Sequence, residues 1–178
     1  MKKIAFYIGA FVLLATSIAC SSEASLQKYY IDSQENKSFI SLDVPASVLK
    51  LKEDVTPEEK ETLASLKKFN ILAFKKDGNN DAEYALEKEK VKTILKNPKF
   101  KELMRVKDKG RNILIKYEGT DELMDEVIVY ASDKTQGFAL VRVLGDKMDP
   151  VKIMKLANSV SDVDSDGFKQ LAGLFKEE

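Results

Sequence analysis

Four stretches in the second half of the chain carry apolar residues in a strand-like pattern, and short clusters rich in Asp, Gly and Thr divide them. Gaps this short join antiparallel neighbours, so the pattern predicts a four-stranded meander. The expected strands are residues 101–107, 111–118, 125–132 and 137–144.

The first half of the chain mixes strand and helix patterns. Ile40, Leu42 and Val44 alternate with polar residues and predict a half-buried strand over 38–44. An apolar strand is expected at 69–74, where the turn cluster 77–80 stops it. Helical segments are expected at 26–31, from Pro45 to Leu51, at 57–67 and at 82–96, the last with Tyr84, Val91 and Leu95 on one face.

Two helix starts have a clear physical cause. Thr56, Pro57 and Glu59 form a capping-box sequence, and Asp149-Pro150 begins a later helix. That later helix is expected to turn Ile153, Leu156, Ala157 and Val160 inward, and a final one to present Phe168, Leu171, Leu174 and Phe175. The predicted fold is a single α+β domain over residues 26–178: an antiparallel sheet with a C-terminal four-strand meander and helices packed on one face.

The first 19 residues have the layout of a signal peptide. Lys2 and Lys3 precede a mostly apolar run, and small residues end at Ala19. The run is shorter than the roughly 20 residues that a membrane-spanning helix needs. Ser17-Ile18-Ala19-Cys20 is similar to the bacterial lipobox, although Ser17 stands where leucine is usual. We therefore expect lipidation of Cys20, with an ordinary secretory peptide or an uncleaved anchor as the alternatives.

The lipid would hold the domain close to a membrane. Two or three acyl chains, such as palmitate, make attachment stable, whereas one anchors only marginally. Residues 20–25 form the lipidated tether, and the 5 residues after the cysteine span at most roughly 17 Å. We expect a cell-envelope protein, anchored to the outer membrane and facing the periplasm.

Composition removes several classes of function. Lys plus Arg and Asp plus Glu both number 29, and no basic run interleaves with aromatic residues, so nucleic acid is not an expected partner. With one Cys and no His, the chain forms no internal disulfide and offers no thiolate or imidazole cluster for zinc, copper, haem or iron–sulfur centres. No cofactor is expected.

Three segments identify a family resemblance: residues 69–74, 102–108 and 138–141, in this order along the chain. They resemble the Bacteroidota lipoprotein family built on domain of unknown function 4252, over roughly residues 25–175. The resemblance implies a cell-envelope lipoprotein of uncharacterised role and brings no catalytic residues. Ser21-Ser22-Glu23-Ala24 departs from the acidic surface-export signal of those bacteria, which favours attachment facing the periplasm.

One acidic loop is a calcium candidate. Asp162, Asp164 and Asp166, followed by Gly167, match the first six positions of an EF-hand loop. The match fails at position twelve, where Gly173 replaces the bidentate Glu. The alternative is that these carboxylates cap the last helix.

Candidates for catalysis are few. Ser47 with Lys50 has Ser-x-x-Lys spacing, but its companion motifs are missing from the sequence. The carboxylate pairs Glu58-Glu59, Asp121-Glu122 and Asp125-Glu126 are expected to solvate and cap rather than to act as acid and base. No enzymatic activity is expected.

The sequence therefore favours a non-catalytic module that binds an envelope protein, as a sensor or an assembly accessory. A small-ligand carrier or carboxylate-based enzyme is the second hypothesis and predicts an apolar pocket with convergent polar groups. A calcium-stabilised module is the third.

Overall fold

The computed structural model describes residues 25–108 and 110–163. Its helical elements are α2 (Leu26–Ser33), the 3-10 turn η1 (Ala46–Val48), α3 (Pro57–Ser65), α4 (Asp81–Leu95) and α5 (Pro150–Ser159). Its strands are β1 (Phe39–Pro45), β2 (Leu49–Leu51), β3 (Leu66–Lys75), β4 (Lys101–Asp108), β5 (Arg111–Gly119), β6 (Met124–Asp133), β7 (Gly137–Met148) and β8 (Val160–Val163).

Six strands form one antiparallel sheet in the order β1-β3-β7-β6-β5-β4, and β2 pairs with β8 in a separate two-stranded sheet. The run from β4 to β7 is the predicted four-strand meander. β3 then pairs with β7, and β1 pairs with β3. The α+β fold with an antiparallel sheet is thus confirmed.

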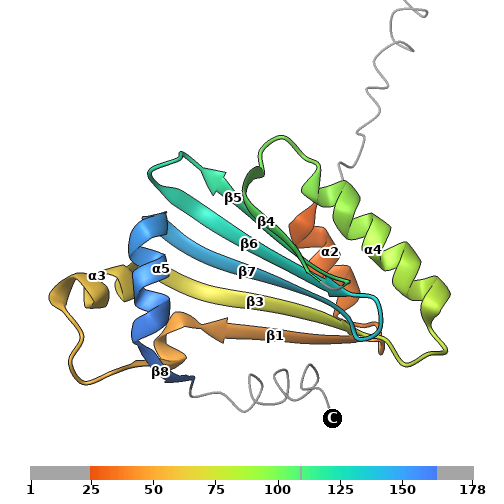
Figure 1. Ribbon diagram of the computed structural model, residues 1–178, viewed down its shortest axis with the longest axis horizontal. Helices are drawn as coiled ribbons and strands as arrows, with labels where there is room; N and C mark the ends of the chain where they lie inside the picture. The colour runs from red at the N-terminus through yellow and green to blue at the C-terminus, as the bar shows by residue number, and fades with distance from the viewer. Residues whose placement is uncertain (1–24, 109, 164–178) are drawn as a thin grey trace, which may run out of the picture.

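Helices α2 and α4 cover one face of the large sheet (Figure 1). Phe74 of β3 stacks on Phe138 of β7 with ring centroids 5.5 Å apart, and Phe39 of β1 meets both rings edge to face. From the helices, Tyr29 and Tyr84 pack against these rings. Aromatic side chains bury large areas, so this cluster is the main core.

Helix α5 lies on the opposite face, at one end of the sheet (Figure 1). Leu156 is 2% exposed and packs with Tyr117, Met124 and Met148. Helices α2 and α4 therefore cover the core of one face and α5 covers one end of the other, whereas the residues of β4 are exposed throughout.

The predicted helix starts are confirmed. Thr56 accepts a hydrogen bond from the backbone N–H of Glu59, whose carboxylate accepts one in return from the N–H of Thr56. Asp149 accepts from the backbone N–H groups of Val151 and Lys152 at the start of α5. These bonds satisfy amide groups that have no partner inside the helix.

Three local expectations are wrong. The segment from Pro45 to Leu51 is the single turn η1 followed by β2, because Leu49–Leu51 pairs with β8. Helix α3 ends at Ser65 rather than residue 67, since β3 begins at Leu66 and pairs there with β7. Val160 lies in β8 instead of the inward face of α5.

A buried ion pair fixes α2 on the sheet. Arg142 of β7 donates two hydrogen bonds to Glu126 of β6, at 2.7 and 3.0 Å, and both side chains are less than 10% exposed. Arg142 also donates to Gln27 of α2 at 2.6 Å, and its guanidinium lies 5.5 Å from the ring centroid of Tyr30. The Tyr30 hydroxyl donates to the carbonyl of Leu140 at 2.6 Å. Every polar group in this contact has a partner, as buried polar groups require.

Replacing Glu126 with Leu is expected to lower the free energy of unfolding by about 3 kcal/mol, because it leaves the Arg142 charge buried without its carboxylate. The double variant Glu126→Leu/Arg142→Met should recover most of that loss. Urea unfolding measures both. The control is Asp125→Leu, an exposed neighbour on β6 whose effect should stay within about 0.5 kcal/mol. A double variant as unstable as the single one would contradict the ion-pair explanation.

Candidate interaction surface

The face of the large sheet that carries α5 is apolar across all six strands. Cross-strand partners in a sheet point their side chains to the same face, so the strand register defines rows of neighbours. One row, here called the valine row, runs from β1 to β4 through Leu42, Ile71, Val141, Val129, Ile115 and Met104. The next, the alanine row, contains Ile40, Ala73, Ala139, Ala131, Ile113 and Val106.

A third row is covered by α5. Phe69, Val127 and Val143 on this face pack in the cluster that contains Ile153 and Leu156 of α5. The valine and alanine rows lie beyond this cluster. Ile71 and Ala73 in these rows are each 1% exposed, so the exposed part of this apolar face does not lie at its centre. Exposed apolar patches often mark interaction sites.

Exposure on this face rises toward β4. Met104 is 48% exposed, Val106 41% and Ile113 37%. Leu103, which has no cross-strand partner because it lies at the β-bulge of β4, is 47% exposed on the same strand. We call these four side chains the β4–β5 strip. Strand β4 pairs only with β5 within the described residues, so its outer edge is open to a partner.

Charged side chains border the strip. Arg105 and Glu102 of β4 form an ion pair at 2.7 Å on the opposite face of the strand, where their cross-strand partners are Leu114 and Lys116. Asp121 accepts hydrogen bonds from Lys101 and from the Tyr117 hydroxyl, both at 2.8 Å, and these two bonds lower the pKa of Asp121. An apolar centre with a polar rim is the usual anatomy of a protein interface.

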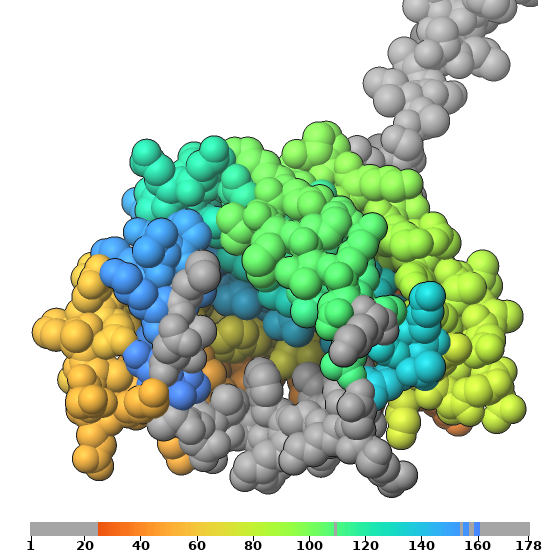
Figure 2. Space-filling model, viewed as in Figure 1, coloured from red at the N-terminus to blue at the C-terminus, as the bar shows by residue number. Residues whose placement is uncertain are grey.

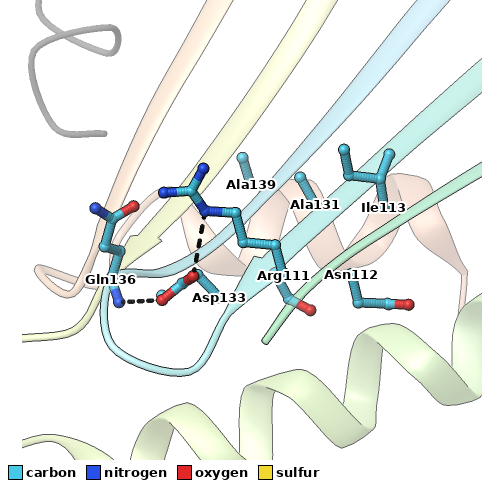
Figure 3. Close-up of a pocket in the computed structure, with 9 residues that line it drawn as sticks. Arg111, Asn112, Ile113, Ala131, Asp133, Gln136 and Ala139 are labelled. Atoms are coloured by element: carbon cyan, nitrogen blue, oxygen red, sulfur yellow. Dashed lines mark hydrogen bonds and ion pairs between the residues drawn. The ribbon is translucent and has the colours of Figure 1, made fainter. Parts of the chain in front are cut away.

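A shallow pocket lies at the β7, β6 and β5 members of the alanine row, beside the turn between β6 and β7 (Figure 3). Its volume is about 260 Å³. In Figure 3 the side chains of Ala131, Ala139 and Ile113 point to the same side of the sheet. Small-molecule sites usually occupy about 300–1,000 Å³, so this hollow is at the lower limit for a ligand.

The polar wall of this pocket is a turn held together by one carboxylate. Asp133 accepts hydrogen bonds from the backbone N–H and hydroxyl of Thr135, both at 2.7 Å, and from the backbone N–H of Gln136 at 3.1 Å. Arg111 approaches it at 3.7 Å. The bonds from Thr135 lower the pKa of Asp133, which therefore stays ionised and suits turn stabilisation better than proton transfer.

A family model, Domain of unknown function (DUF4252), matches residues 29–156 of the chain. The chain belongs to this family. Neither the curated proteins nor the solved structures give a significant match. The region matched by the DUF4252 model contains the β4–β5 strip, the pocket and the Arg142–Glu126 pair.

The predicted Ser-Lys pair lies at the other end of the sheet. Ser47 is exposed in η1, and Lys50 is exposed in β2. Ser47 lines a second shallow hollow of about 390 Å³, where the neighbouring amines are those of Lys60 and Lys67. The structure thus gives this pair no enclosed site.

The carboxylate pairs have other partners. Glu59 accepts from the Ser159 hydroxyl and from the N–H and hydroxyl of Thr56, and these bonds lower its pKa. Asp121 belongs to the rim of the strip, and Glu126 to the buried ion pair. In this DUF4252 domain, these three carboxylates hold structure together.

The remaining candidates fall outside the matched region. Asp162 lies in β8, and its cross-strand neighbour in the backbone register is Lys50 of β2. Asp164, Asp166 and Cys20 lie outside the described residues. Among the residues described, no group of three or more acidic or Cys side chains could hold a metal ion. Within the same residues, no helix has the length and apolar character to span a membrane.

Sequence reasoning missed the β4–β5 strip. Residues 101–107 are predicted as a strand, but their apolar pattern does not distinguish an exposed side chain from a buried one. Apolar residues on both alternations of a strand are typical of a strand covered on both faces, so this pattern predicts burial rather than the exposure that β4 has.

Replacing Asp133 with Asn is expected to lower stability at pH 7, because the variant loses the charge that Thr135 and Gln136 stabilise. The pKa of Asp133 in the folded protein lies below its unfolded value of about 3.9. The difference in stability between the wild type and the variant should therefore be complete above a pH of about 3.9 and should vanish as the pH falls through the folded pKa. Unfolding midpoints measured from pH 7 to 2.5 test this. The variant Thr135→Ala should raise the pKa of Asp133, as followed by NMR titration; an unchanged pKa would contradict the assigned cause.

Proposed function

We propose that this protein is a lipid-anchored cell-envelope domain that binds a partner protein through the β4–β5 strip. The observation that carries the proposal is the strip itself: four large apolar side chains, each 37–48% exposed, on the edge strand β4 and its neighbour β5, with the Lys101–Asp121 ion pair beside them. Exposed apolar patches with polar borders are typical of binding surfaces.

The partner that fits this surface is an apolar protein segment laid along β4. Met104 is an unbranched and adaptable side chain, which suits a docking surface. The free edge of β4 offers backbone groups that an extended segment could pair with. A nucleic-acid partner is disfavoured, because Glu102 and Asp121 offset the cations at the rim.

The lipid anchor rests on the lipobox-like sequence that ends at Cys20. The polar tether between Cys20 and α2 is short, and α2 is held on the sheet by Gln27 and Tyr30. Lipidation would therefore keep the sheet close to the bilayer, where the partner is expected to be another envelope protein. We place the anchor in the outer membrane, facing the periplasm.

We also infer that the protein is not an enzyme. The two hollows described above are shallow, and among the carboxylates with a resolved shift, Glu59, Asp121 and Asp133 have lowered rather than raised pKa values. A general acid at neutral pH needs a raised value.

Radioactive palmitate fed to producing cells is expected to label the wild-type protein and not the Cys20→Ser variant. The matched control, Ser22→Ala, changes a neighbouring residue of the tether and should keep the label. Label retained by Cys20→Ser would end the lipoprotein proposal and leave the strip proposal standing.

The variant Met104→Glu is expected to weaken recovery of the partner at least tenfold, the effect of losing about 1.4 kcal/mol of binding free energy at a central apolar contact. Recovery is measured by crosslinking in native membranes, affinity capture and quantitative mass spectrometry. The control is Leu86→Glu, because Leu86 is 66% exposed on α4, which packs on the other face of the sheet. Equal recovery with the wild type and Met104→Glu would refute the strip as the binding surface.

A further inference from the structure

The outer edge of β4 is open in the described part of the chain. Strand β4 pairs with β5 on its inner side and with no described strand on its outer side. All 8 of its residues are exposed. The space-filling view shows this strand at the surface, with no described element in front of it (Figure 2). An open strand edge is a template for pairing with a strand of another chain.

The charges along β4 are complementary to their own reverse order. The strand begins with a cation and an anion, Lys101 and Glu102, and ends with a cation and an anion, Lys107 and Asp108. Lys101 and Glu102 belong to ion pairs within the chain, whereas within the described residues Lys107 and Asp108 have no ion-pair partner. Two antiparallel copies of such a strand place opposite charges next to each other at both ends.

The β-bulge at Leu103 puts the complementary charges on the same face. Without it, Lys101 and Asp108 would point to opposite faces, because they are an odd number of residues apart. The extra residue shifts the alternation by one position, so both pair with β5 residues of the α5 face, at Tyr117 and Arg111. By the same register, the other face of β4 carries Glu102, Arg105 and Lys107.

We propose that the open edge of β4 pairs antiparallel with β4 of a second copy of this chain, around a two-fold axis at Arg105. The axis is perpendicular to the sheet, so each face of one sheet continues into the same face of the other. In this register Lys101 lies opposite Asp108 of the second copy, and Glu102 opposite Lys107. The two charges that lack a partner within the chain thus each gain a neighbour of opposite charge.

The charges also select this register over its neighbours. An axis moved one position to Val106 places Arg105 opposite Lys107, which brings two cations together. An axis moved one position to Met104 leaves Lys107 and Asp108 beyond the end of the other strand. With the axis at Arg105, the two Arg105 side chains meet, but each keeps its ion pair with the carboxylate of Glu102 at 2.7 Å.

The apolar side chains near the axis then lie together on the α5 face. Met104 lies opposite Val106 of the second copy, once on each side of the axis. The β4–β5 strips of the two copies therefore adjoin and form one continuous apolar surface. The inference rests on the proposed function of this strand, because the second copy is the extended segment that pairs with its edge, while the joined strips stay on the face for the envelope partner.

Disulfide formation in native membranes tests the register on the full-length chain. In the proposed pairing the two copies of Arg105→Cys are directly opposite, with Cα atoms about 5 Å apart, which suits a disulfide. The two copies of Met104→Cys would be about 8 Å apart and those of Lys107→Cys about 14 Å, beyond the reach of a disulfide. We expect mild oxidation to join Arg105→Cys into a dimer several-fold more than either neighbour.

The wild-type chain, whose single cysteine is Cys20, is the control for dimers joined elsewhere and should stay monomeric on a non-reducing gel. The Arg105–Glu102 ion pair is exposed, so the loss of Arg105 should not unfold the domain. No dimer at Arg105→Cys, equal dimer at all three positions, or most dimer at Met104→Cys would overturn the proposal.

Exchange of two charges tests the complementarity. In the Arg105→Cys chain, adding Lys107→Glu places a carboxylate opposite Glu102 of the second copy, and the dimer yield should fall several-fold. Adding Glu102→Lys as well returns opposite charges to the pair and should restore the yield. The control is Lys37→Glu, the same reversal at an exposed residue just before β1, the strand at the other edge of the sheet. It should leave the yield unchanged. A yield that the exchange does not restore would overturn the proposed pairing.

Failure of the pairing and failure of the strip as the surface for an envelope partner give different results. No dimer at Arg105→Cys together with lost partner recovery by Met104→Glu would remove the second copy and keep the strip. A dimer at Arg105→Cys together with unchanged partner recovery by Met104→Glu would remove the strip and keep the second copy.

Discussion

The structure depends on a sheet that is apolar on both of its faces. Buried strands of this kind need a layer on each side, because every uncovered apolar row remains in contact with water. Helices α2 and α4 supply one layer, with aromatic residues such as Tyr84 and Phe74 at its centre. Helix α5 supplies only part of the other, so apolar residues such as Met104 and Val106 of β4 remain exposed on that face.

A polar contact joins α2, the first described helix, to the sheet. Most of the helix-covered face is apolar, but Arg142 and Glu126 put a fully paired charge beneath α2. Such a pair adds little net stability compared with apolar residues, yet it is costly to break, so it favours one position of α2 over alternatives. Because α2 is the first helix of the described residues, that position also fixes how their N-terminal end lies on the sheet.

Much of the fold could be predicted from local patterns, and the misses have a common cause. The meander was predictable because turn clusters such as Asp108–Gly110 separate regular strands, and α3 because Thr56 and Glu59 cap it. The short strands β2 and β8 carry no pattern of their own and exist because they pair with each other. The insertion of β3 between β1 and β7 is likewise a long-range pairing that no local signal contains.

The candidate surface was not predictable, because exposure is decided by what lies above a strand rather than by the strand itself. Val106 on β4 and Val141 on β7 belong to the same face of the same sheet, yet Val106 is 41% exposed, whereas Val141 packs beside the buried Ile71. An edge strand that exposes apolar residues risks pairing with any other chain. Lys101, Glu102 and Arg105 put charged side chains along β4, and charge on an edge strand opposes nonspecific pairing, while Met104 and Val106 of the same strand remain exposed. Exposed apolar side chains and charged side chains therefore occur together on the edge strand β4, and the docking proposal rests on this combination.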